Sequence, residues 1–313
     1  MPMPANPEIQ ATGEALAATL QSLSGPRPGF RPVVDTEGHA KGILLQGTFE
    51  PTPQAKALSK AHHFNESSTP VIARFSSSTG NPDIPDSDPR GNPRGFALRF
   101  QLAETPRRVH TDIIAHSIDG TPGSDGKEVL RFFTGLKNET VGEYLTGHPK
   151  AAEFMNIPRP FPASFAHQRH YAVNTLKLVA SSGAETFIRY RFEPVAGVRN
   201  ISAEEAAANG PNYLFGEIPK TLAEGPIQFR LMAQVAEEGD VTDDCLVKWP
   251  ETRTMVELGM VSLRAVMQHN EAVQKYIIFD PVPRVDGVEA SDDRLLQYRA
   301  AAYLASGLEH RKG

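Results

Sequence analysis

Arg299 and Tyr303, near the C-terminal end of the chain, have the residue types and the spacing of a metal-binding pair. Residues four positions apart in a helix lie on one face, so the guanidinium would lie beside the phenol. A cation at hydrogen-bonding range favours the phenolate form of a tyrosine. Because a phenolate is a hard, strongly donating ligand for ferric iron, the pair predicts an iron site with Tyr303 as the ligand.

Three alanines, Ala300 to Ala302, separate this pair. They predict a flat helix face against which a planar macrocycle such as haem could lie. An Arg-x-x-x-Tyr pair is also common on helix surfaces, where it makes only a cation–π or hydrogen-bond contact. The motif therefore needs support from the rest of the sequence.

The helix that carries the pair is predicted over 291–305. Ser291 is expected to cap its N-terminus, Asp292 and Asp293 suit the positive end of its dipole, and Gly307 is expected to end it. Apolar residues at helical spacing predict further helices over 7–24, 52–63, 125–136 and 202–208.

Short runs bounded by Gly, Pro, Asn and Asp have the character of strands. In Phe96–Phe100, for example, bulky apolar side chains alternate along the chain. The runs cover 43–49, 70–76, 95–101, 109–114, 171–179, 185–193, 226–235 and 255–263, with a hairpin turn between the fifth and the sixth. Roughly eight strands with few intervening helices predict an antiparallel barrel.

Four segments, in the same order along the chain, resemble core motifs of the haem catalases. They are His39-Ala40-Lys41-Gly42, Ala73-Arg74-Phe75-Ser76, Pro93-Arg94-Gly95-Phe96-Ala97, and the stretch from Phe279 to Tyr303. The short chain, which ends soon after the tyrosine, resembles the small catalase-related peroxidases. This resemblance implies an α+β haem-catalase-like fold: an antiparallel eight-stranded β-barrel with surrounding α-helices, without the C-terminal extra domain of large catalases.

The resemblance also implies haem b (iron protoporphyrin IX) as the cofactor and assigns roles to residues. Tyr303 becomes the axial ligand of the haem iron, and His39 the catalytic acid–base opposite it. A neutral imidazole can take a proton from one peroxide oxygen and return it to the other, since its pKa lies near ~6.5. Ser76 is a second catalytic residue that contacts the histidine. The residues expected to bind the cofactor are Arg74, Arg299, Arg311 and Phe132, although an ordinary core explains Phe132 equally well.

Two positions depart from the catalase pattern. The stretch from Asp112 to Ser117 replaces an Asp-Leu-Val-Gly-Asn-Asn segment, so the distal asparagine that polarises bound peroxide is absent. Its absence is expected to weaken the oxidation of a second peroxide molecule, and His116 or Ser117 could substitute in part. Thr36 stands where catalases have an arginine three residues before the distal histidine, which makes Arg311 a candidate to anchor a propionate.

The composition is that of an ordinary soluble globular protein, with 313 residues, 40% hydrophobic and 22% charged, and a net charge of −5. Neither nucleic acid nor a membrane is an expected partner, because the chain has no basic excess and no apolar run of about 20 residues. The single cysteine, Cys245, indicates a reducing compartment, and no secretory signal is evident, so a cytoplasmic protein is expected. Residues 1–30 are interpreted as an N-terminal helical arm and 31–313 as a single haem-binding domain.

The resemblance to the catalase-related peroxidases implies a haem peroxidase, an oxidoreductase acting on peroxide as acceptor. Its partners would be hydrogen peroxide or an organic hydroperoxide and a small organic electron donor, and its catalase activity would be weak. One alternative is a fatty-acid hydroperoxide isomerase like the allene oxide synthases, which share this haem fold. Another is a barrel that carries haem or another ligand without catalysis. Large catalases assemble through segments mostly lacking here, so a monomer or homodimer is expected.

Overall fold

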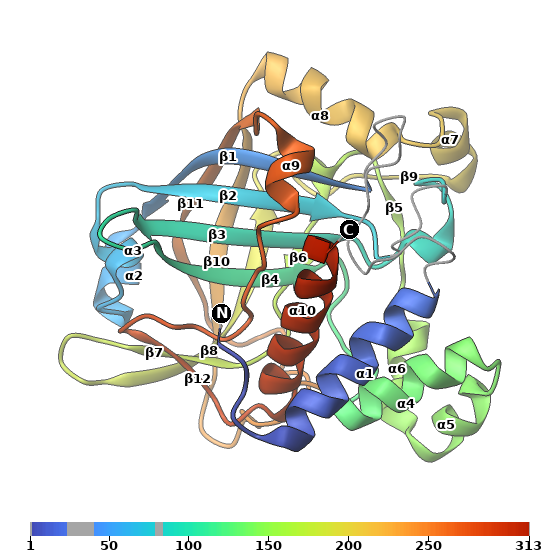
Figure 1. Ribbon diagram of the computed structural model, residues 1–313. Coiled ribbons are helices and arrows are strands. Elements are labelled where there is room, and N and C mark those ends of the chain that lie inside the picture. The colour runs from blue at the N-terminus through green and yellow to red at the C-terminus, as the bar shows by residue number, and fades with distance from the viewer. Residues whose placement is uncertain (1, 24–40, 79–83, 313) are drawn as a thin grey trace.

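A closed barrel of eight antiparallel strands is the centre of the computed structural model, which describes residues 2–23, 41–78 and 84–312 (Figure 1). Around the ring the strands follow the order β8-β10-β11-β1-β2-β3-β4-β6, and β6 pairs with β8 to close it. The predicted barrel is confirmed. Its strands are β1 (Gly42–Pro51), β2 (Thr69–Ser76), β3 (Gly95–Ala103), β4 (Val109–His116), β6 (His170–Tyr171), β8 (Glu185–Pro194), β10 (Ile227–Val235) and β11 (Met255–Val266).

The run predicted as one strand over 171–179 is instead divided into β6 and β7 (Leu176–Val179). Between them the chain leaves the ladder to bind the carboxylate of Asp293, which accepts from Asn174 Nδ2 at 2.9 Å and from the backbone N–H of Thr175 at 3.3 Å. β7 forms the predicted hairpin with β8 and pairs on its other side with β12 (Val288–Ala290). A separate two-stranded sheet joins β5 (Phe161–Pro162) to β9 (Asn200–Ile201).

Aromatic rings from alternate positions fill the interior of the barrel. The ring centroid of Phe96 lies 4.9 Å from that of Phe75, 4.7 Å from that of Phe192 and 5.2 Å from that of Phe229. All four side chains are buried. Because neighbouring residues of a strand point to opposite faces, the outer faces of the same strands can line a site.

The helix predicted over 52–63 is two short helices, α2 (Pro53–Leu58) and α3 (His62–Asn65). Ser59 ends the first of them. Its backbone N–H donates to the carbonyl of Ala55 at 3.0 Å, and its hydroxyl donates to the carbonyl of Gly287 at 2.7 Å. A contact with a distant segment therefore divides a pattern that looks continuous in the sequence.

Three helices form a layer on one side of the barrel: α1 (Pro7–Leu23), α4 (Gly126–Lys137) and α10 (Arg294–Lys312). Figure 1 shows α1 alongside α10, and α1 packs against both α10 and α4. Ala300 lies in the core on the barrel side, Ala301 faces Gly13 of α1, and Ala302 packs in a cluster with Leu16. The prediction that the three alanines present a flat face to a macrocycle is therefore wrong, because their small size lets α10 approach its protein neighbours.

Helix α10 begins and ends later than predicted. Asp293 caps it rather than Ser291, because Oδ1 of Asp293 accepts from the backbone N–H of Leu295 at 3.0 Å. The hydroxyl of Ser291 instead donates to the carbonyl of Thr175 at 2.7 Å. The helix also continues through Gly307. A Cβ at Gly307 would lie 2.5 Å from the side chain of Ile278, so this glycine permits a close approach and does not end the helix.

The predicted helix near 202–208 is α7 (Ala203–Ala208), which Ser202 and Glu205 begin with a capping box. Sequence patterns did not single out α5 (Val141–Gly147), α6 (Pro149–Asn156), α8 (Tyr213–Glu224) or α9 (Asn270–Gln274), nor the 3₁₀ turns Pro89–Gly91 and Phe165–His167. The predicted boundary between 30 and 31 lies outside the described residues, so the division into arm and domain stays a prediction.

Candidate cofactor site

The outer face of strands β1 to β4 presents two adjacent rows of side chains. In the first row the strand register aligns Leu44, Arg74, Ala97 and Ile114. Leu44 and Ile114 belong to a hydrophobic cluster that is separate from the aromatic interior, which identifies this face as the outer one. The first row is thus an apolar surface with one cation in it.

The second row is polar and lies one step further along the same strands. The register aligns Gly42, Ser76, Gly95 and His116 across β1 to β4. A Cβ at Gly95 would lie 2.6 Å from Oγ of Ser76, so the glycine leaves room between the serine and the histidine. Ser76 and His116, both predicted site residues, are therefore brought onto one face.

His116 carries a neutral imidazole across the ordinary pH range. Burial, and in second place the charge of Arg299, lower its pKa to about 4. Its Nδ1 has no hydrogen-bond partner among the residues that the structure describes. Such a nitrogen can accept or donate a hydrogen bond to a small polar molecule, depending on its tautomer.

Ser117 directly follows the end of β4 and is bound to the start of β3. Its Oγ accepts from the backbone N–H of Arg94 at 2.9 Å, and its own N–H donates to the carbonyl of that residue at 2.9 Å. The serine is thus engaged in holding the start of β3. This geometry favours His116 over Ser117 as the residue in the place of the distal asparagine.

Tyr303 projects from α10 toward the apolar row. It is partly buried and packs against the cluster formed by Leu44, Ile72, Ile114, Ile277 and Phe279. The predicted ligand and the polar row therefore belong to the same region, with α10 on one side and the barrel face on the other. Ile277 and Phe279 supply two of the apolar side chains, and of these only Phe279 belongs to a motif that the sequence singled out.

Arg299 lies one turn before Tyr303, and its guanidinium donates to Oδ1 of Asn174. Nδ2 of Asn174 in turn donates to Oδ2 of Asp293 at 2.9 Å. Burial raises the pKa of the Asp293 carboxyl, while its hydrogen bonds oppose that shift. The cation is thus held by a neutral amide. Sequence reasoning missed Asn174, because 125 residues separate it from Arg299 and no local spacing links them.

The other predicted cofactor-binding residues are spread more widely. Nε of Arg74 donates to Oε1 of Gln274 in α9 at 3.0 Å, which keeps the guanidinium at the barrel face. Arg311 is exposed, and it donates to the carbonyl of Tyr276 at 3.0 Å.

The ring of Phe132 is buried, and its ring neighbours all lie in helices α4 to α6 (Phe133, Tyr144 and Phe154, with centroids 5.2, 6.0 and 5.9 Å away). These contacts favour a structural role for Phe132 in the helical layer. Its role at a cofactor stays a prediction.

His39 and Thr36 lie outside the described residues. Lys41, which follows His39 by two residues in the same motif, is among the described residues. Nζ of Lys41 donates to Oδ1 of Asp86 at 3.0 Å and to Oδ1 of Asn212 at 2.5 Å. Both charged side chains of this ion pair are buried, with 2% and 0% of their surface exposed. A buried charge that loses its partner is strongly destabilising, so this pair holds Lys41, and with it the C-terminal half of the histidine motif, in place.

The residues described here fit a haem group. The face offers apolar side chains suited to a macrocycle, the phenol oxygen of Tyr303, and the cations of Arg74 and Arg299. Within the described ranges no three His, Cys, Asp or Glu side chains gather to hold a bare metal ion. In the same ranges no helix is both long enough and apolar enough to cross a membrane.

Comparison with known proteins gives concordant matches. The family model for catalase matches residues 32–106 and 134–313. A catalase-related peroxidase of Mycolicibacterium paratuberculosis is 31% identical, over 92% of this chain and 91% of that protein. A second one, of Synechococcus elongatus, is 27% identical over 96% of this chain and 89% of that protein. A solved bacterial catalase superposes with a TM-score of 0.75 at 23% identity, and the match covers 88% of this chain but only 57% of that one.

Proposed function

The chain belongs to the catalase family, and from this premise we propose that it is a haem-dependent peroxidase. It reduces hydrogen peroxide, organic hydroperoxides or both with a small organic electron donor, and its catalase activity is weak. One observation carries the proposal: Tyr303 covers an apolar barrel face whose adjacent row contains Ser76 and His116.

Haem b bound in the proposed site would supply a ferric iron able to cleave the O–O bond of a peroxide. Tyr303 would hold the iron through its phenol oxygen, and Arg299 lies one turn earlier in the same helix. Arg74 would bind one haem propionate, and Arg311 is a candidate to bind the other. His39 takes the proton from one peroxide oxygen and returns it to the other.

His116 distinguishes this site from that of a catalase with a distal asparagine. An amide always offers two N–H donors, whereas a neutral imidazole offers one donor and one acceptor. His116 therefore polarises a bound peroxide less, which supports weak catalase activity and a larger role for an organic donor. Acidification below about pH 4 would place a cation at this position.

The environment of Cys245 fits a reducing compartment, and we propose a cytoplasmic location. Its side chain is buried, and burial is the main cause that raises the pKa of its thiol to about 12. The assembly we propose is a monomer or a homodimer.

The electronic spectrum of the ferric, haem-loaded protein tests the proposal. Tyr303→Phe removes only the proposed ligand oxygen, so it should abolish the tyrosinate-type high-spin spectrum of the wild type. Tyr298→Phe is the matched control, because Tyr298 lies in the same helix but packs against Gly126 of α4. If both variants keep the wild-type spectrum, Tyr303 is not the ligand.

Product analysis then separates the chemical alternatives. The wild type is incubated with a lipid hydroperoxide, with and without an electron donor. The alcohol, formed only with the donor, supports a peroxidase. A rearranged product formed without the donor indicates an isomerase, and a rate no higher than that of the same concentration of haemin indicates a haem carrier.

A further inference from the structure

Arg99 and Asp112 form a buried ion pair on the barrel face beneath the site. The register places them directly opposite each other in β3 and β4. Nε and Nη2 of Arg99 donate to the two carboxylate oxygens of Asp112 at 2.8 and 2.7 Å. The side chains are 12% and 0% exposed, so water screens this bidentate pair little.

Both members of the pair also hold one segment of chain, residues 276–280, which we name the strap. Nη2 of Arg99 donates to the carbonyl of Ile278 at 2.6 Å. The backbone N–H of Asp280 donates to Oδ2 of Asp112 at 2.8 Å. The guanidinium also lies over the ring of Phe279, 5.1 Å from its centroid. An arginine fork can make all these contacts at once, whereas a lysine ammonium cannot.

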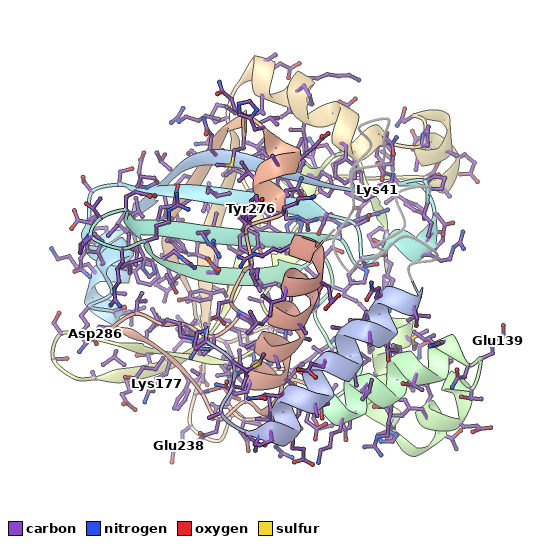
Figure 2. All side chains as sticks on the ribbon, viewed as in Figure 1. Lys41, Glu139, Lys177, Glu238, Tyr276 and Asp286 are labelled. Carbon is purple, nitrogen blue, oxygen red and sulfur yellow. The ribbon has the colours of Figure 1, made fainter. Side chains whose placement is uncertain are left out.

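The opposite side of the strap touches α10 just beyond Tyr303. A Cβ at Gly307, one turn after Tyr303, would lie 2.5 Å from Cγ1 and 2.6 Å from Cδ1 of Ile278. Two turns after Tyr303, Arg311 donates to the carbonyl of Tyr276 at 3.0 Å. Figure 2 labels Tyr276 beside α9 and the C-terminal end of α10.

We propose that Arg99 and Asp112 are positioning residues that set, through the strap, how far Tyr303 stands from the barrel face. The strap lies between the ion pair and the last turns of α10, so its distance from the barrel fixes that of the helix. Ile277 and Phe279 pack in the same cluster as Tyr303. The inference rests on the proposed role of Tyr303 as an iron ligand.

Hydrogen exchange of the haem-free protein tests the first step. Arg99→Lys keeps the charge but loses the fork, so exchange in a peptide that covers 276–284 should become about tenfold faster. Arg230→Lys is the control, because Arg230 pairs with Glu257 across β10 and β11 at 3.6 Å and both side chains are 40% or more exposed. Equal protection in wild type and Arg99→Lys would overturn the proposal.

Haem retention and the ferric spectrum test the second step. Arg99→Lys and Gly307→Ala should each release haem to an apoprotein acceptor about tenfold faster and shift the tyrosinate-type spectrum, while Arg230→Lys does neither. Ile278→Ala removes the atoms that a methyl at residue 307 would meet, so it should restore the spectrum of Gly307→Ala. If Arg99→Lys and Gly307→Ala keep the wild-type spectrum and haem release while Tyr303→Phe loses the spectrum, the positioning role is refuted and the proposed function stands. If Tyr303→Phe also keeps the spectrum, the proposed function itself has failed.

Discussion

Helix α1 packs so closely against α10, the helix that carries Tyr303, that a methyl group added at Gly13 should lower the unfolding free energy. A Cβ at Gly13 would lie 2.3 Å from Cβ of Ala301 and 2.9 Å from the backbone carbon of the same residue. Helix propensity alone favours Gly13→Ala by about 1 kcal/mol. Overpacking against backbone that cannot rotate away costs up to about 3 kcal/mol. The expected net loss of unfolding free energy is therefore up to about 2 kcal/mol.

Urea unfolding of a double-mutant cycle measures this effect. Ala301→Gly removes the nearest of the clashing atoms, so in its presence Gly13→Ala should cost about 1–2 kcal/mol less than it does in the wild type. Gly216→Ala is the control, because a Cβ there meets no atom within 4 Å in α8, and it should leave stability unchanged or raise it by up to about 1 kcal/mol. If Gly13→Ala and Gly216→Ala have the same effect, or if the coupling between residues 13 and 301 is zero, the packing argument is refuted.

Two more predictions concern buried titratable groups. His170 lies within the aromatic interior, where burial lowers its pKa to about 3, whereas an unfolded histidine titrates near ~6.5. As the pH falls, the unfolded chain therefore takes up this proton before the folded protein does, so stability is lost progressively from pH ~6.5 down to about 3. His170→Phe removes the titrating group and matches the surrounding rings. Between pH 6 and 4 it should reduce the slope of unfolding free energy against pH by the amount that corresponds to about one bound proton. A slope equal to that of the wild type in acid urea titrations would contradict this. Burial also raises the pKa of the Cys245 thiol to about 12, so a disulfide reagent at pH 8 should label no thiol in the native protein and one after unfolding; rapid labelling of the native protein would show that the thiol is accessible.

The sequence predicted those features of this protein that depend on residues close together in the chain. The alternation in Phe96–Phe100 and similar runs predicted the strands of the barrel, because a half-buried strand repeats every two residues. The spacing of Arg299 and Tyr303 placed both residues on one helix, α10. Arg74 and Ser76 lie two positions apart in β2, so the alternation of a strand puts both on one face.

Contacts between distant segments decided the rest. The partner of Arg299 is Asn174, and the contact that requires Gly307 comes from Ile278, so neither could be found from neighbours in the chain. The three alanines looked like a surface for a macrocycle and are in fact packed against protein, because a small side chain signals close approach but does not identify what approaches. Sequence periodicity determines which face of an element is buried. Only the assembled barrel and helices determine what that face is buried against.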